Sequence, residues 1–136
     1  MSPTPANICL MSPETMPPTK GYSHVAEVSG GRTIYLSGQI ALDRDGNLVG
    51  EGDMRAQARQ VFENLKAGLA AAGVDFDHVV KLNFYVLDAS QMQAVRDVRD
   101  QYINTANPPA STALEVRNFV REGLLIEVDA VAVAPN

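Results

Sequence analysis

The chain has 136 residues, of which 46% are hydrophobic and 20% are charged, and these values are typical of a single globular domain. Its formal net charge of -5, with basic residues that form no run, argues against general nucleic-acid binding, which rests on clustered Lys and Arg. Cys9 is the only cysteine, so no intrachain disulfide can form, and it is expected to be inert. No apolar run approaches the ~20 residues of a membrane helix, and no signal peptide is visible. A cytoplasmic protein is therefore expected.

Residues 1–20 are predicted to form a leader that is extended or mobile, with its last part docking on the domain. The reason is the density of prolines, which fix the backbone and remove hydrogen-bond donors: Pro3, Pro5, Pro13, Pro17 and Pro18. Residues 21–136 are then predicted to form one domain.

The first structured part begins with two strands. Residues 24–28 form a short strand, and Gly30-Gly31 lies in a turn after it. Residues 33–37 alternate, with Ile34 and Leu36 on one face. Asp45-Gly46 then predicts a turn inside a loop.

The first helix has the clearest pattern in the chain. Asp53 is a plausible N-cap, and Gly73 is well placed to end the helix. Between them, apolar residues recur at spacings of three and four and form one stripe: Met54, Ala58, Val61, Phe62, Leu65 and Leu69.

The second half repeats the alternation of strand and helix. A strand is predicted over residues 78–87, with Val80, Leu82, Phe84 and Val86 on one face. A second helix is predicted over residues 90–105, with Val95, Val98 and Tyr102 as its buried stripe, ahead of the helix-breaking Pro108 and Pro109. Two further strands are predicted over residues 111–117 and 124–133.

The resulting order is β-β-α-β-α-β-β, and two helices can cover only one face of such a sheet. The other face holds a mixture of residues such as Tyr35, Lys81 and Tyr85, joined from the last strand by either Glu127 and Asp129 or the opposite set. This mixture favours burial against another copy of the chain with ions paired across the interface, and a solvated sheet face is the alternative.

Several stretches in order along residues 20–134 carry a family resemblance. They are Gly21-Tyr22-Ser23-His24-Val25, Tyr35-Leu36-Ser37-Gly38-Gln39-Ile40, the run from Ala56 to Leu65, Val79-Val80-Lys81, Asn107-Pro108-Pro109-Ala110-Ser111-Thr112, Leu114-Glu115-Val116 and the run from Leu125 to Val133. The chain resembles the Rid family of reactive intermediate deaminases, also called YjgF or L-PSP proteins. The resemblance implies a chorismate-mutase-like α+β fold and a homotrimer whose sheets form a barrel, with a small-molecule cleft between subunits. It also implies hydrolysis of enamines or imines without a metal or an organic cofactor.

One position departs from what the resemblance implies. The family's arginine, which clamps the substrate carboxylate, would stand at Ser111, and a serine hydroxyl supplies no delocalised cation. Weak or absent activity on ordinary 2-imino acids is therefore expected. Arg96 matches a position that lies in the family's cleft and is a candidate replacement, while a surface pair with Asp100 four residues on is the alternative.

The remaining candidates come from the same resemblance. Glu115 is the candidate catalytic acid or base and is expected to face away from the helices, with a structural ion pair as the alternative. Tyr22 is expected to close the pocket or simply to pack. Ser37 and Gly38 are expected to hold the ligand through the backbone, unless Gly38 only permits a tight bend.

The two histidines do not suggest a metal site. His24 is expected to be structural or exposed, and His78 is expected to be solvated.

The function predicted from the resemblance is an imine or enamine deaminase with altered substrate choice. A trimer that binds a small ligand without catalysis is the alternative, and an endoribonuclease, after old family labels, is disfavoured by the acidity of the chain.

Overall fold

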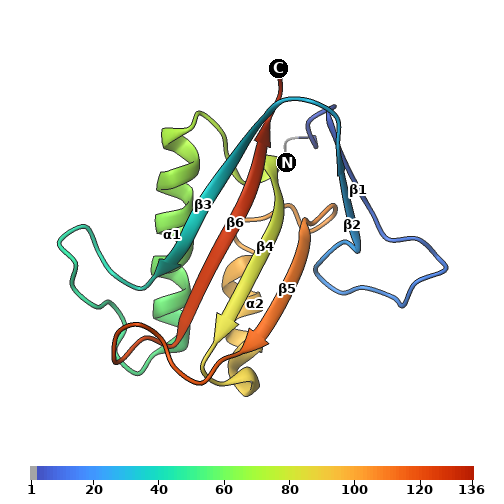
Figure 1. The fold of residues 1–136 in the computed structure, drawn as a ribbon. Helices are drawn as coiled ribbons and strands as arrows, with labels where there is room; N and C mark the ends of the chain where they lie inside the picture. The colour runs from blue at the N-terminus through green and yellow to red at the C-terminus, as the bar shows by residue number, and fades with distance from the viewer. Residues whose placement is uncertain (1–2) are drawn as a thin grey trace.

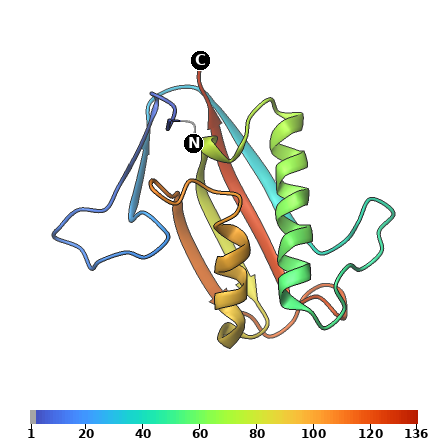
Figure 2. The same ribbon diagram turned by 180° about the vertical axis from the view of Figure 1, so that it is seen from behind.

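A computed structural model describes residues 3–136 and has a four-stranded mixed sheet with two α-helices behind it (Figure 1, Figure 2). The strand order is β3-β6-β4-β5, in which only the β4–β5 pair is parallel. This is the predicted α+β architecture. The strands are β1 (Ile8–Met11), β2 (Val25–Val28), β3 (Arg32–Ile40), β4 (Val79–Val86), β5 (Ala110–Glu115) and β6 (Ile126–Ala134), and the helices are α1 (Met54–Ala71) and α2 (Met92–Arg99).

Helix α1 forms where its pattern predicts it. The Asp53 side chain accepts a hydrogen bond from the Ala56 amide at 3.1 Å, which satisfies a free donor of the first turn. Gly73 follows the helix with φ of 78°, a conformation that favours glycine at this end. All six predicted stripe residues are buried, so α1 supplies one wall of the core against the sheet.

The buried face of β4 differs from the prediction at one residue. The pairing of β4 with β6 shifts between Val79 and Lys81, so Val80 is an extra residue in a β-bulge. Val79 therefore joins the core under the helices, and Val80 packs instead in a small cluster with Ile8 and Val133. A period of two cannot predict such an inserted residue, because the bulge resets the alternation.

Helix α2 is shorter than predicted and ends at Arg99. After it, the amides of Gln101 and Tyr102 bond to carbonyls three residues back, so the chain tightens into turns. Tyr102 still stacks on Phe62, with ring centroids 5.2 Å apart. The apolar spacing thus continues beyond the point where the α-helix stops, and this misled the sequence prediction.

The leader contains a strand that the sequence did not predict. β1 pairs antiparallel with β2, and Ile8 is buried against Val80. The His24 ring nitrogen lies 2.8 Å from the Pro17 carbonyl, and the His24 amide donates to the Ser12 hydroxyl at 3.1 Å. His24, at the end of the loop between β1 and β2, therefore contacts the start of that loop at Ser12 and its middle at Pro17. This role is structural.

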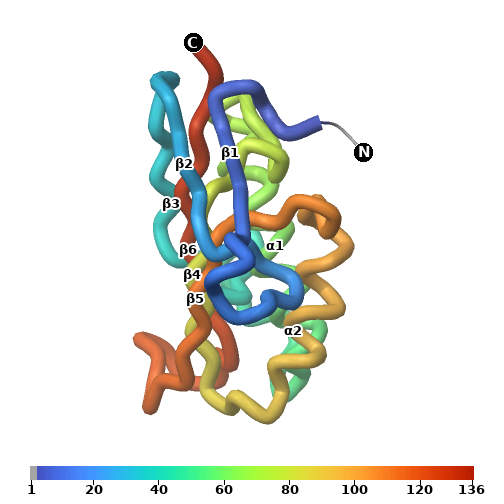
Figure 3. Tube along the Cα trace, turned by 90° about the vertical axis from the view of Figure 1, so that its right-hand side faces the viewer, coloured from blue at the N-terminus to red at the C-terminus, as the bar shows by residue number. Residues whose placement is uncertain are grey.

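Figure 3 shows the sheet edge-on, with α1 and α2 on one side and no helix of residues 3–136 on the other. We call the side without helices, which carries Tyr35, Lys81, Tyr85, Glu127 and Asp129, the open face. Neither helix in the described part of the chain is long and apolar enough to cross a membrane.

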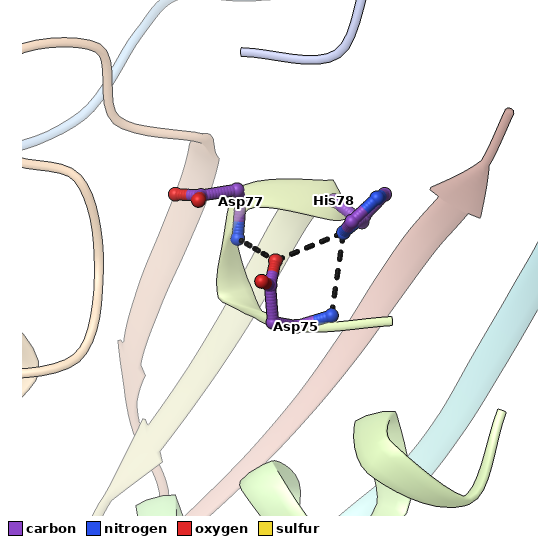
Figure 4. Close-up of polar contacts among 3 residues, drawn as sticks. All are labelled: Asp75, Asp77 and His78. Atoms are coloured by element: carbon purple, nitrogen blue, oxygen red, sulfur yellow. Dashed lines mark hydrogen bonds and ion pairs between the residues drawn. The ribbon is translucent and has the colours of Figure 1, made fainter. Parts of the chain in front are cut away.

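His78 is less exposed than predicted, because it takes part in a cap before β4 (Figure 4). The Asp75 carboxylate accepts from the Asp77 amide at 3.0 Å, and the His78 Nδ1 lies 2.9 Å from the same oxygen. The His78 side chain retains 21% exposure. These three residues hold the short 3₁₀ turn that leads into the central strand.

Gln57 is fully buried in α1 and ties two loop segments together, the one before α1 and the one before β6. Its amide nitrogen donates to the carbonyls of Gly50 and Gly123 at 3.1 and 2.9 Å, and its oxygen accepts from the Leu125 amide at 2.8 Å. Gln57→Leu would leave these three backbone groups without their partner and put an apolar side chain beside them. We expect the free energy of unfolding in urea to fall by about 2–4 kcal/mol.

The control for this prediction is Gln60→Leu, one turn along the same helix. Gln60 is half-buried and donates only to Asn64, at 2.9 Å. Its replacement should cost under ~1 kcal/mol. Equal losses in the two variants would contradict the role assigned to Gln57.

Candidate functional site

The start of β5 is joined to the segment that carries Tyr22. The Ser23 hydroxyl donates to the Pro108 carbonyl at 2.6 Å, and the Ser23 amide donates to the Pro109 carbonyl at 3.0 Å. Ser23 also forms an isolated parallel bridge with Ala110, next to Ser111. The half-buried Tyr22, which meets the His24 ring edge-on, is thereby fixed beside the first residues of the edge strand.

The register of β5 corrects the predicted direction of Glu115. Ser111 and Glu115 pair with Leu82 and Val86, which are buried under the helices. Paired residues of parallel strands point to the same face, so Ser111 and Glu115 lie on the helix side and not on the open face. The Glu115 carboxylate accepts from the Ala89 amide at 2.9 Å and thus holds the turn that precedes α2.

The open face carries a hydrogen-bonded group centred on Asp129. Asn83 donates to one carboxylate oxygen of Asp129 at 2.7 Å, and Tyr85 donates to the other at 3.1 Å. The hydrogen bond to Asp129 raises the pKa of the Tyr85 phenol, and desolvation and the Asp129 and Glu127 charges add to this effect. Tyr85 therefore stays protonated at neutral pH and remains a donor, and Asp129 has both oxygens occupied.

Glu127 lies beside Gly38 on the open face. The β3–β6 pairing shifts between Leu36 and Gln39, so Gly38 sits within an irregularity of β3. A Cβ added at Gly38 would collide with the Glu127 carboxylate. Gly38 has no positive φ, so the space taken by Glu127, and not a tight bend, explains the glycine. Unlike the carboxylates of Glu115 and Asp129, the Glu127 carboxylate accepts no hydrogen bond from another residue of 3–136.

A hollow of about 360 Å³ opens on this face next to Glu127. Tyr85, Asp129 and the β5–β6 loop residues Phe119 and Val120 contribute to its wall. Val120 is 90% exposed and Tyr35 is 79% exposed, so the open face offers apolar side chains to a partner or a ligand.

The sequence analysis had left open whether Glu127 and Asp129 or their neighbours face this side, and it had not chosen either carboxylate as a site residue. The available signal was a pair of carboxylates alternating with the apolar residues of a strand that is otherwise buried, residues 126–134. Ionisable groups in such a strand are rarely placed there for packing. The structure groups Ser37 and Gly38 with Glu127, whereas Ser111 and Glu115 lie across the sheet.

Arg96 does not form the surface ion pair with Asp100 that was the alternative to a role in binding. Asp100 instead pairs with Arg99, at 2.9 Å. Arg96 lines a separate cavity that also contains Lys20 and Gly21, the residue before Tyr22. Among residues 3–136, no group of three or more His, Cys, Asp or Glu side chains is arranged to hold a metal ion.

Comparison with known proteins identifies the family. A family model described as Endoribonuclease L-PSP matches residues 13–134. The crystal structure of YyfB from Yersinia pestis, a protein of unknown function in the conserved Rid family, superposes with a TM-score of 0.88 at 36% identity, covering 94% of this chain and 99% of that one. The chain belongs to the Rid family.

Two further relatives of this Rid-family protein differ in what their names state. Protein DfrA from Myxococcus xanthus is 42% identical over 113 residues, which cover 83% of this chain and 85% of DfrA. A human protein named 2-iminobutanoate/2-iminopropanoate deaminase is 36% identical over 102 residues, covering 75% of this chain and 73% of the human protein. The name of the latter states deamination of 2-iminobutanoate and 2-iminopropanoate.

Proposed function

We propose that this Rid-family protein is a deaminase that hydrolyses the imine or enamine form of a small reactive metabolite. The observation that carries the proposal is the Glu127 carboxylate, which accepts no hydrogen bond from another residue of 3–136 and lies against Gly38 beside an open hollow. The human relative named as a 2-iminobutanoate/2-iminopropanoate deaminase supports the reaction class.

The reaction needs one group that accepts and returns a proton. A water molecule adds to the carbon of the protonated C=N bond while a carboxylate takes one of its protons, and this gives a neutral carbinolamine. The same carboxylate returns the proton to nitrogen, the C–N bond breaks as the carbinol hydroxyl loses its proton to the carboxylate, and ammonia and a carbonyl compound leave, the ammonia taking up that proton as ammonium. An enamine enters the sequence after protonation at carbon. A carboxylate with both oxygens free suits this exchange better than one that is fully hydrogen-bonded.

Glu127 and the site residues predicted from the sequence divide between two sides of one protomer. Glu127, Ser37 and Gly38 belong to the open face, whereas Ser111 and Arg96 belong to the helix side. We propose that a cleft between copies completes the site, with the open face of each chain packed against its neighbours in a homotrimer. The polar side chains in the middle of this face bond to one another, as Lys81 does to Thr112 at 2.8 Å, so the exposed Tyr35 is left for an apolar contact.

Sedimentation equilibrium tests this assembly. At micromolar concentration we expect a mass of about three times the 14.6 kDa of one chain. Tyr35→Asp should shift the mass toward the monomer, because it places a charge on an open face that is buried in the assembly. Lys66→Asp, on the exposed surface of α1, is the control and should leave the mass unchanged. A wild-type monomer would contradict the interface.

The reaction itself is tested by releasing imines in solution and measuring ammonia. An amino acid oxidase generates each 2-imino acid from its parent amino acid, and the formation of ammonia is compared with spontaneous hydrolysis. Acceleration for at least one imine supports the proposal. Binding of an imine analogue without acceleration would identify a ligand-binding protein instead, and cleavage of RNA would identify the endoribonuclease.

A further inference from the structure

A cavity of about 480 Å³ lies between α2 and the end of the leader, apart from the open face. Its wall contains the cationic groups of Lys20, Arg96 and Arg99 and a single carboxylate, that of Asp100. The whole chain carries a net charge of -5, so this gathering of cations runs against the overall balance. Its volume lies in the range of small-molecule sites.

Arg99 is the fixed member of this cavity. It is only 7% exposed, although arginine is almost never buried without a partner. Its Nε donates to the Oδ1 atom of Asp100 at 2.9 Å, and its Nη2 lies 2.9 Å from that same oxygen. The guanidinium also lies against Gly21, where an added Cβ would collide with it and where φ is 81°. The Gly21 backbone and Asp100 thus hold the cation in one orientation.

The remaining two cations have no ionic partner in the described chain. Asp100 is taken by Arg99, and neither Arg96 nor Lys20 forms an ion pair with any residue of 3–136. The three cations and one carboxylate leave the cavity with an excess of two positive charges. A partly enclosed excess of this kind attracts an anion, and a guanidinium favours a carboxylate because its donors match the two oxygens.

The position of the cavity relates it to the proposed reaction. Gly21 lies two residues before Ser23, which is bonded to the carbonyls at the start of β5. The cavity therefore borders the helix side of the sheet, the side to which Ser111 points. Ser111 does not line the cavity, so a carboxylate held here would be bound apart from position 111 and would not restore the two-point clamp for an ordinary 2-imino acid.

We propose that Arg99, Arg96 and Lys20 bind the carboxylate group of a small organic anion. The identification of this anion with the imine substrate rests on the proposed function, whereas the binding site itself does not. In the site Arg99 is the preoriented donor, and the exposed Arg96 and Lys20 close on the ligand from the rim.

The test is a calorimetric titration of the full chain with sodium succinate in Tris chloride at constant ionic strength. Succinate carries carboxylates and cannot be deaminated, so its binding is independent of any turnover. Arg96→Gln should raise the dissociation constant for succinate at least ~10-fold, since a charge-assisted hydrogen bond is lost. Arg96 is exposed, and an unchanged thermal unfolding temperature verifies that this variant is folded.

The matched control is Arg44→Gln, which makes the same change in net charge on an exposed loop residue outside the cavity. It should leave the succinate affinity unchanged. Three results would overturn the proposal: no succinate binding by the wild-type chain, equal weakening by Arg44→Gln, or tighter binding of inorganic phosphate than of succinate.

Imine hydrolysis is followed separately in the same preparations. Succinate binding that Arg96→Gln weakens, in a protein that releases no ammonia from any imine, would leave the carboxylate site standing and remove the proposed function. Imine hydrolysis in a protein that does not bind succinate would do the reverse.

Discussion

Glu127→Gln is expected to lower the turnover of an imine substrate by about 10²-fold or more, the usual scale for loss of a general acid or base. Glutamine keeps the length and shape of the side chain but cannot exchange a proton. The Glu127 carboxylate accepts no hydrogen bond from another residue of 3–136, so the substitution should leave the stability of the fold unchanged. The measurement is kcat from ammonia release, with the unfolding temperature taken on the same sample.

Glu115→Gln is the matched comparison, because Glu115 was the acid or base predicted from the sequence. Its carboxylate holds the Ala89 amide, and the glutamine oxygen can accept the same hydrogen bond. We expect kcat within a few fold of the wild type. A large fall in Glu115→Gln together with an active Glu127→Gln would reverse the assignment and restore the sequence-based prediction.

The second large effect concerns Ser111 and 2-iminopropanoate. We expect the wild-type chain to have a kcat/KM for this compound about 10²–10⁴-fold below that of the human relative assayed alongside, because a lost charged two-point contact costs several kcal/mol. Ser111→Arg should recover part of this difference. The half-buried Ser111 lies on the edge strand, where a longer side chain can leave the sheet without entering the core.

Ser111→Lys separates charge from geometry. Lysine restores the positive charge but not the planar pair of donors, so its gain should be clearly smaller than that of arginine. Wild-type activity equal to that of the human relative would contradict the expected deficit. It would mean that another cation already clamps the carboxylate.

The sequence predicted the layers of the fold because those depend on periodic burial. The stripe of α1 is a strong pattern over a long element and is found where predicted, and β6 covers most of the strand predicted over residues 124–133. Local departures were missed for physical reasons. The bulge at Val80 changes which face a residue occupies, and the turns after Arg99 keep the apolar spacing of a helix that has ended.

The candidate site was harder to predict, because it depends on the direction of side chains between distant segments. β5 is joined to β4 in parallel, and only this register places Glu115 on the helix side. Likewise, the local sequence around Arg99 is that of an ordinary surface residue of a short helix, and only the fold brings Gly21 against its guanidinium. The local sequence predicts neither the register of β5 nor this contact.

The contact between Gly38 and Glu127 separates the demands of folding from those of the proposed chemistry. An alanine at position 38 would meet the Glu127 side chain from its Cγ to its carboxylate and no backbone atom, and this flexible side chain can move away at little cost to folding. The carboxylate would then leave its place beside the hollow. Gly38→Ala is therefore expected to give a folded protein in which the proposed acid or base is displaced.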